Sequence, residues 1–255
     1  MSDVLKVWID REGRLLRLRL NRPKANIVDA EMFASIDAAL TAHGGNPGLL
    51  AILIDAEGPH FSFGASVQEH LPENCAAMLR TFHALILRMV KSEIPILVAV
   101  HGQCLGGGLE LAMSGHLMFV APDAKLGQPE IKLAVFAPAA SCLMPERIGR
   151  ALAEDLLFSG RSITGAEAAA IGLANVAAEN PEAAALAWFD EYLAGASGIA
   201  LRHAVAAARV GLAERLAERL AAVEKLYLDS LMFSHDAVEG LQAFIAKRPA
   251  KWEHR

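Results

Sequence analysis

The sequence has little of several features that mark other classes of protein. Aromatic residues fill 6% of its 255 positions, and it has three cysteines, Cys75, Cys104 and Cys142, with no C-x-x-C pair. Cysteines so few and scattered argue against a disulfide framework or a cysteine-based metal site, so buried, reduced thiols are expected. The 24 Lys and Arg are outnumbered by 29 Asp and Glu. Because phosphate attracts positive charge, this balance argues against a general nucleic-acid binder.

Long apolar runs are also missing. The most apolar stretch, Ile94 to Val100, is far shorter than the roughly 20 residues that a membrane-spanning helix needs. The first residues lack the basic-then-apolar pattern of a signal peptide. We therefore expect a cytoplasmic protein with no membrane partner. Hydrophobic residues make up 54% of the chain, which excludes intrinsic disorder.

Short apolar stretches alternate with segments of helical periodicity, which is typical of an α/β architecture with right-handed crossovers. The predicted strands cover residues 4–10, 15–20, 50–55, 94–100 and 116–121, with a hairpin turn at 11–13. The predicted helices cover residues 30–42, with Asp29 as the cap, residues 76–91, and a segment that ends at Met113. From Pro181 onward the pattern is almost entirely helical, with a break at 195–198.

A glycine-rich turn follows the predicted strand at 94–100. It reads Gly-Gln-Cys-Leu-Gly-Gly-Gly-Leu-Glu, from Gly102 to Glu110. It matches neither a phosphate loop, which ends in Gly-Lys-Ser/Thr, nor the G-x-G-x-x-G dinucleotide fingerprint. Free N–H groups at the start of a helix suit an anion or a developing oxyanion. Close packing of the helix on the strand, with no ligand, is the alternative explanation.

Two glutamates lie in apolar surroundings next to turns. Glu110 ends the glycine-rich turn, and Glu130 follows Gly-Gln-Pro within Ala124–Ile131. Burial raises the pKa of a carboxyl, so two such groups together suggest a general acid and a general base. A third motif, Phe61–Ser66, offers a further backbone N–H after a strand. The chain has no H-E-x-x-H and no G-x-S-x-G motif, which argues against a zinc protease and a serine hydrolase.

These motifs together resemble the crotonase superfamily of enoyl-CoA hydratases and isomerases. The resemblance covers nearly the whole chain and is carried by Asn21–Asn26, Phe61–Ala65, Gly102–Glu110, Gly127–Ile131 and Glu239–Arg248. It implies a spiral of ββα units over residues 1–194 and a C-terminal helical trimerisation region over 195–255. It also implies a homotrimer or homohexamer that acts on an acyl-CoA thioester.

The resemblance also assigns roles to residues. The backbone N–H groups of Ala65 and Gly107 would form an oxyanion hole for the thioester carbonyl, and Glu110 and Glu130 would be the catalytic pair. Further residues expected to bind substrate or its CoA part are Lys24, Ala25, Ser66, Val67, Gln68, Phe244 and Lys247. Phe244 and Lys247 would reach the CoA of a neighbouring subunit. No metal is implied, and no cofactor, since coenzyme A is part of the substrate.

Two departures from the common family pattern point to a subgroup. Ser66 stands where an acid is usual, and Ala134–Ser141 replaces a glycine-rich stretch. In these features the chain is similar to cyclohexa-1,5-diene-1-carbonyl-CoA hydratases, which act in anaerobic benzoyl-CoA degradation. Their product is 6-hydroxycyclohex-1-ene-1-carbonyl-CoA. We expect an apolar pocket wide enough for a ring, with candidate lining residues Phe63, Val67, Phe136 and Leu143.

Other functions remain open from the sequence. Within the family the alternatives are a straight-chain enoyl-CoA hydratase and a Δ3-Δ2-enoyl-CoA isomerase. An isomerase can work with one glutamate, so the presence of both Glu110 and Glu130 favours hydration. A non-catalytic protein of the same fold that binds acyl-CoA or RNA is the alternative from another class. The intact glutamates weaken the first version, and the acidic balance weakens the second.

Overall fold

The computed structural model describes residues 4–255 and begins with a β-hairpin. Strand β1 (Leu5–Asp10) pairs antiparallel with β2 (Leu15–Leu20), from Leu5 opposite Leu20 to Asp10 opposite Leu15. A short 3-10 turn, η1 (Arg11–Gly13), joins them. The predicted hairpin is therefore confirmed, and its apolar positions on β2 are buried.

A six-stranded sheet forms the centre of the molecule, in the order β1-β2-β3-β4-β6-β9. Its other strands are β3 (Ala51–Ala56), β4 (Ile96–Val100), β6 (Leu117–Val120) and β9 (Val176–Ala177). All pairings from β2 onward are parallel. Strands β3 and β4 are buried on both faces, as in parallel sheets covered by helices. The α/β prediction is thus confirmed.

A smaller sheet carries two of the predicted motifs. It consists of β5 (Gln103–Leu105), β7 (Lys125–Gly127) and β8 (Ser162–Thr164), in the order β5-β7-β8. Because β5 and β7 pair in parallel, the three glycines of the glycine-rich turn that follow β5 and the Gln-Pro-Glu segment that follows β7 begin side by side. The sequence pattern did not predict these three short strands.

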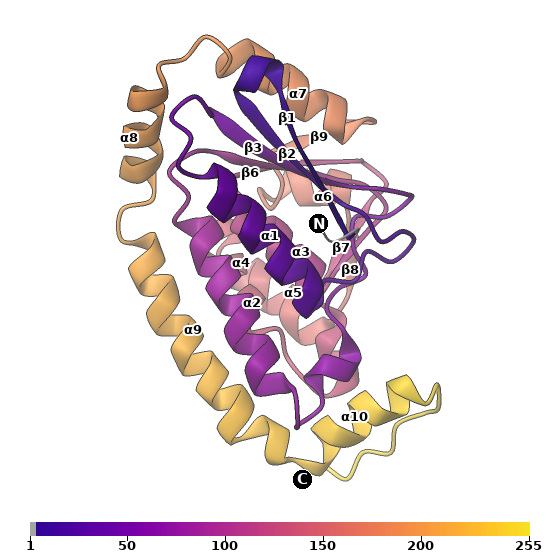
Figure 1. Ribbon diagram of the computed structural model, residues 1–255. Coiled ribbons are helices and arrows are strands. Elements are labelled where there is room, and N and C mark those ends of the chain that lie inside the picture. The colour runs from indigo at the N-terminus through magenta and orange to yellow at the C-terminus, as the bar shows by residue number, and fades with distance from the viewer. Residues whose placement is uncertain (1–3) are drawn as a thin grey trace.

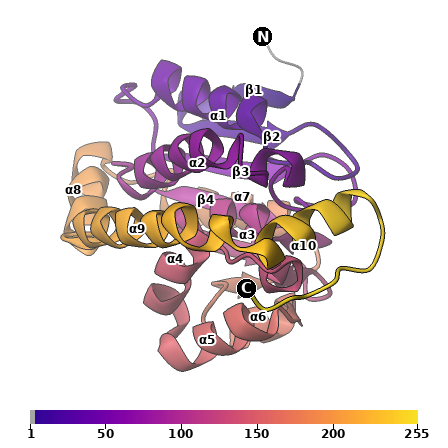
Figure 2. The ribbon, with the colours of Figure 1, turned by 90° about the horizontal axis from the view of Figure 1, so that it is seen from below.

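The helices of the first three quarters lie on one side of the large sheet (Figures 1 and 2). They are α1 (Ala30–His43), α2 (Cys75–Val90), α3 (Gly107–Ser114), α4 (Pro138–Ile148), α5 (Arg150–Ser159) and α6 (Gly165–Ala170), with the 3-10 segments η2 (Val67–His70) and η3 (Pro129–Leu133). Asp29 caps α1 by accepting from the Met32 N–H at 3.0 Å, as predicted. The three cysteines are buried and free.

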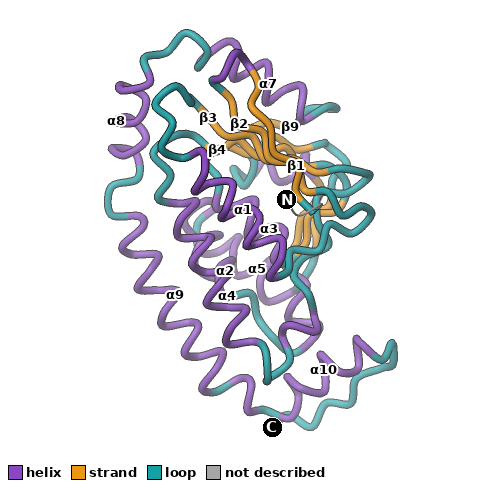
Figure 3. The backbone as a smooth tube through the Cα atoms, viewed as in Figure 1, coloured by secondary structure: helices purple, strands orange, loops and turns teal. Residues whose placement is uncertain are grey.

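The C-terminal quarter wraps the rest of the molecule in helices, as Figure 3 shows. They are α7 (Pro181–Tyr192), α8 (Gly198–Ala208), α9 (Leu212–Asp229) and α10 (His235–Ile245), with η4 (Leu231–Phe233) before α10. Helix α7 covers the other face of the large sheet, while the long α9 packs along α2 and α4. The predicted boundary at 194/195 falls in the turn between α7 and α8. Its role as a domain boundary stays a prediction.

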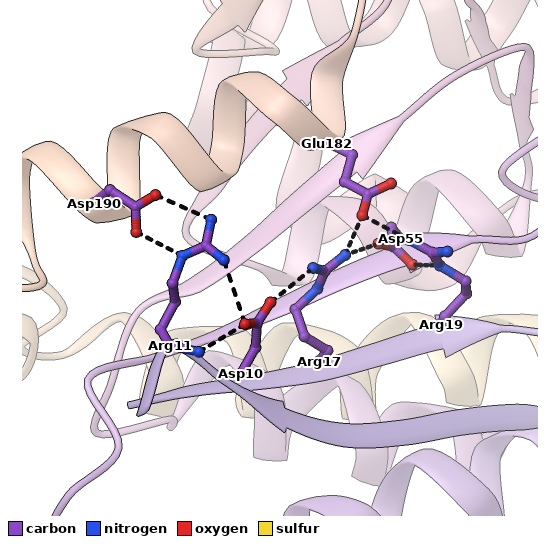
Figure 4. A network of polar contacts seen from close by, with 7 residues as sticks. All are labelled: Asp10, Arg11, Arg17, Arg19, Asp55, Glu182 and Asp190. Carbon is purple, nitrogen blue, oxygen red and sulfur yellow. Dashed lines mark hydrogen bonds and ion pairs between the residues drawn. The ribbon is translucent and has the colours of Figure 1, made fainter. Parts of the chain in front are cut away.

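A network of charged side chains fastens α7 to the sheet (Figure 4). Arg17 and Arg19 on β2 both bind Asp55 on β3, with shortest distances of 2.6 Å, and both bind Glu182 on α7. Arg17 is also paired with Asp10 at 3.3 Å. Arg17 and Asp55 are almost fully buried, so each needs its partner to offset the loss of hydration.

No helix within residues 4–255 combines the length and the apolar character required to cross a membrane.

Candidate active site

The glycine-rich turn places two backbone amides side by side. Gly106 has a positive φ of 51°, a conformation that favours glycine, and α3 begins at Gly107. A methyl group built on Gly107 would lie 3.0 Å from the amide nitrogen of Ala65. Among residues 4–255, neither of these two N–H groups donates to a protein acceptor. The two amides are therefore free to bind one oxygen, and their oxyanion role stays a prediction.

Glu110 is buried in the first turns of α3, with 5% of its surface exposed. Its Oε1 accepts from the Ala140 N–H at 2.8 Å, so the carboxyl caps the start of α4. Burial raises the Glu110 pKa to about 7, against the lowering effect of the Ala140 and Ala139 amides. This carboxyl can therefore gain or lose a proton near neutral pH.

Glu130 lies on η3, close to the glycine-rich turn. A methyl group built on Gly106 would lie 2.5 Å from Glu130 Oε1, and the Gly106 N–H donates to Gly127 O at 2.9 Å. Burial, and secondly the charge of Glu110, raise the Glu130 pKa to about 8. The structure thus brings the two glutamates to one place, although they lie on different elements.

Gln128 faces the Glu130 carboxyl from the same segment. Its side chain is buried, and in the amide orientation that satisfies both groups its nitrogen lies 3.0 Å from Glu130 Oε2 and 3.2 Å from Oε1. Sequence reasoning gave this residue no role. Its position two residues before Glu130, between a short strand and a proline, was the available signal.

A cavity of about 670 Å³ opens beside the free amides and Glu130. Its lining includes the predicted residues Ala65, Ser66, Val67, Gln68, Phe244 and Lys247, together with Phe63 and Glu130. Further lining comes mainly from apolar side chains, namely Ile27, Leu105, Leu133, Val135, Leu241 and Ile245. A mostly apolar cavity with a few polar groups is typical of a small-molecule site. Neither Glu110 nor Gly107 lines this cavity. Another hollow, of about 480 Å³ between Leu40 and Arg202, contains neither glutamate.

Some predicted residues lie elsewhere. Lys24 and Ala25 do not line the cavity, although Ala25 O accepts from the N–H of the lining residue Phe63 at 2.9 Å. Leu143 lies in the hydrophobic core and the half-buried Phe136 packs against it, so only two of the four candidate ring-pocket residues, Phe63 and Val67, reach the cavity. The apolar sequence pattern predicts that a residue is buried, but it does not distinguish a residue packed inside the protein from one that lines a pocket.

Phe244 and Lys247 reach the cavity of their own chain. Leu241 and Phe244 on α10, and Lys247 just after it, line the same cavity as Glu130. The resemblance had implied that Phe244 and Lys247 reach the CoA of a neighbouring subunit. In this structure they line the cavity of their own chain, and their contact with the CoA of a neighbouring subunit stays a prediction.

His70 is a cavity residue that sequence reasoning missed. Its Nδ1 lies 2.8 Å from Ser66 O, and burial lowers its pKa. The imidazole is therefore neutral around pH 7, with Nδ1 donating. No motif or spacing in the sequence marks this histidine.

Comparison with known proteins gives the family. The model for "Enoyl-CoA hydratase/isomerase" matches residues 10–255. The chain belongs to the enoyl-CoA hydratase/isomerase family. It is 63% identical over 254 residues to the cyclohexa-1,5-dienecarbonyl-CoA hydratase of Thauera aromatica, covering 100% of this chain and 98% of that protein. It is 31% identical to the crotonyl-CoA hydratase of Syntrophomonas wolfei, covering 96% and 97% of the two chains.

Solved structures confirm the fold of this family member. A putative enoyl-CoA hydratase from Mycobacterium avium paratuberculosis K-10 superposes with a TM-score of 0.87 at 21% identity, covering 98% of this chain and 99% of that chain. An enoyl-CoA hydratase/isomerase from Pseudoalteromonas atlantica T6c gives 0.84 at 24% identity, with 98% and 99% coverage. The predicted crotonase-like fold, with its C-terminal helices, is therefore confirmed.

The site of this enoyl-CoA hydratase/isomerase family member combines two chemical capacities. Its paired carboxyl groups have pKa values near 7 and 8, so around neutral pH one can be ionised while the other keeps its proton. The two free amides can hold an oxygen that becomes negative. Glu130 and Ala65 line the cavity, and Glu110 and Gly107 adjoin them without lining it, so general acid, general base and anion stabilisation come together at one site.

Proposed function

We propose that this protein is a hydratase that converts cyclohexa-1,5-diene-1-carbonyl-CoA to 6-hydroxycyclohex-1-ene-1-carbonyl-CoA in anaerobic benzoyl-CoA degradation. The observation that carries the proposal is the pairing of the buried carboxyl of Glu110 with the half-buried Glu130, beside the free amides of Ala65 and Gly107. The 63% identity to the Thauera aromatica hydratase over the whole chain supports the ring substrate.

The thioester carbonyl receives negative charge as water attacks. Water adds to the β-carbon, and electrons move through the conjugated system to the carbonyl oxygen. The N–H groups of Ala65 and Gly107 bind that oxygen, and each donor of this kind can lower the barrier by about 3 kcal/mol. The start of α3 at Gly107 adds the positive end of a helix dipole.

The two glutamates complete the proton balance. The ionised carboxylate takes one proton from the attacking water. The oxygen of that water, with its remaining hydrogen, becomes the ring hydroxyl. The protonated carboxyl gives its proton to the distal carbon of the diene system, which leaves one double bond conjugated with the thioester. One water is consumed, and the pair ends with its two protonation states exchanged, so a proton passes between them before the next turnover.

The proposal also includes the residues that bind CoA, the absence of a further cofactor, the location of the enzyme and its subunit number. Lys24 and Lys247 would neutralise CoA phosphates, and coenzyme A enters as part of the substrate, with no further cofactor or metal. We place the enzyme in the cytoplasm as a homotrimer or homohexamer. Apolar side chains exposed at the end of α9 and in η4, such as Leu226 and Phe233, support burial against another subunit.

A substrate panel tests the proposal. Purified protein is assayed with the cyclic dienoyl-CoA, with crotonyl-CoA and with a Δ3-enoyl-CoA, and products are identified by mass. We expect the highest kcat/KM for the cyclic substrate. Preference for crotonyl-CoA would instead assign a straight-chain hydratase, and a double-bond shift without added water would assign an isomerase.

Two variants test the chemistry. Glu110→Gln and Glu130→Gln should each lower kcat by about two to four orders of magnitude, since general acid–base catalysis contributes about that much. Binding of the CoA ester should persist in both. Near-normal turnover would remove that residue from the mechanism. If the parent turns over no CoA ester but retains RNA in a filter-binding assay, the enzymatic proposal fails.

A further inference from the structure

A tyrosine hydroxyl beside the carboxyl pair has no assigned use. Tyr227, near the end of α9, is fully buried, and its hydroxyl has no hydrogen-bond partner in the part of the chain that the structure describes, residues 4–255. Native proteins leave few buried polar groups unpaired, because the loss of hydration is unfavourable. A phenylalanine would fill the same space without that cost, so the hydroxyl calls for a partner that is not part of the folded chain.

The position of Tyr227 is set by three elements around the site. Its ring meets the Phe136 ring edge-on, with centroids 5.2 Å apart and an interplanar angle of 72°. Phe136 lies between η3, which carries Glu130, and the start of α4, which Glu110 caps. Helix α9, which carries Tyr227, packs against α2 and α4 and lies between them in Figure 2. The Tyr227 ring therefore packs between α9 and the segment that joins η3 to α4, that is, between the elements that hold Glu130 and the Glu110 carboxyl.

The electrostatic surroundings agree with this placement. After burial itself, the groups that raise the Tyr227 pKa are the Cys75 thiol at the start of α2 and the carboxyls of Glu130 and Glu110. A phenol held in this state keeps its proton. Tyr227 is therefore available as a hydrogen-bond donor and is not suited to act as a base.

The proposed ring hydration needs such a donor. The protonated glutamate must direct its O–H at the distal carbon of the diene, so this O–H cannot donate to the water, although the other oxygen of the same carboxyl can still accept from it. The attacking water donates its hydrogens to the carboxyl oxygens and uses one lone pair for the β-carbon. Its second lone pair is left for a neutral donor.

We propose, building on the proposed hydratase function, that the Tyr227 hydroxyl donates a hydrogen bond to the water held by Glu110 and Glu130. It continues to hold the same oxygen after that oxygen has become the ring hydroxyl. The phenol O–H bond is not broken at any step. Tyr227 thereby fixes the direction of attack and adds a residue of the C-terminal helices to the site.

The test is Tyr227→Phe, which removes the hydroxyl and keeps the ring. The matched control is Tyr192→Phe, because Tyr192 is the chain's other tyrosine and is largely exposed. Parent and both variants are compared for kcat and KM on the cyclic dienoyl-CoA, for the pH dependence of kcat, and for thermal unfolding. Loss of one oriented hydrogen bond in the transition state should lower kcat about 10- to 100-fold. KM should stay within about twofold, since the hydroxyl does not contact the CoA part.

The other readouts separate this role from a structural one. Removing a donor from the water beside the base raises the pKa of that base, so the acidic limb of the kcat profile should move to higher pH. Thermal stability should be unchanged or higher. Unchanged kcat and pH profile in Tyr227→Phe, or an equal loss of activity and stability, would overturn the inference. If the parent itself fails to hydrate the cyclic substrate, the proposed function fails instead.

Discussion

Replacing Glu110 by glutamine should stabilise the protein in a way that depends on pH. The Glu110 carboxyl is buried, and its pKa rises from 4.5 to about 7. The unfolded chain loses this proton near pH 4.5, whereas the folded chain keeps it until about pH 7. Between these values the folded state binds more protons, so the stability of the parent falls as pH rises. A glutamine has no proton to lose, so the variant escapes this fall.

The size of the effect follows from the shift. One pKa unit corresponds to about 1.4 kcal/mol, so a rise from 4.5 to about 7 corresponds to roughly 3 kcal/mol. The glutamine Oε1 can still accept from the Ala140 N–H. Its amide hydrogens have no assigned acceptor there, which adds a cost that does not vary with pH. The gain in unfolding free energy should therefore grow by roughly 3 kcal/mol between pH 4.5 and pH 8.

The assay is denaturant unfolding of parent and variant at pH 5, 6, 7 and 8, at equal protein concentration. Glu73→Gln, at an exposed position, serves as the matched control because it makes the same chemical change outside the buried site. The variant should lose activity while it gains stability at pH 8, since a buried, ionised active-site carboxyl lowers the free energy of unfolding of the parent. Parallel stability curves for parent and Glu110→Gln across this range would refute the reasoning.

Three further substitutions test other parts of the structure. Gly107→Ala keeps its backbone N–H but places a methyl 3.0 Å from both the amide nitrogen and the Cβ of Ala65. This overpacking should displace the two amides from each other, lowering kcat/KM about 10²- to 10³-fold and lowering the melting temperature as well; unaltered activity would contradict the need for their close approach. Lys247→Gln removes a charge that would neutralise a CoA phosphate, so it should raise KM for the CoA ester several-fold at low salt with kcat unchanged. Added salt should remove the difference in KM between parent and variant; a difference that does not depend on salt would contradict this role. Arg17→Met leaves Asp55 with Arg19 as its remaining partner in the network and should cost about 3 kcal/mol in urea unfolding; a neutral outcome would show that the network contributes little.

Much of this protein follows from local sequence. Alternating and continuous apolar stretches gave β1, β2, β3, β4 and β6 within a residue or two, because side-chain periodicity reports directly on which face is buried. The sequence also predicted the Asp29 cap and the turn at 195–197, since both depend on a few neighbouring residues. The glycine-rich turn and the two glutamates stood out for the same reason: their residue types are unusual in apolar surroundings.

Only the tertiary structure decided how these parts form a site. The parallel pairing of β5 with β7 sets Gly106 against the Glu130 carboxyl, and the close approach of Ala65 to Gly107 joins two distant loops. The fold of α10 over its own cavity, the placement of His70 and the burial of Tyr227 depend on contacts between segments far apart in the chain. Local periodicity does not predict such contacts, because it indicates that a residue is buried but not which residues it packs against.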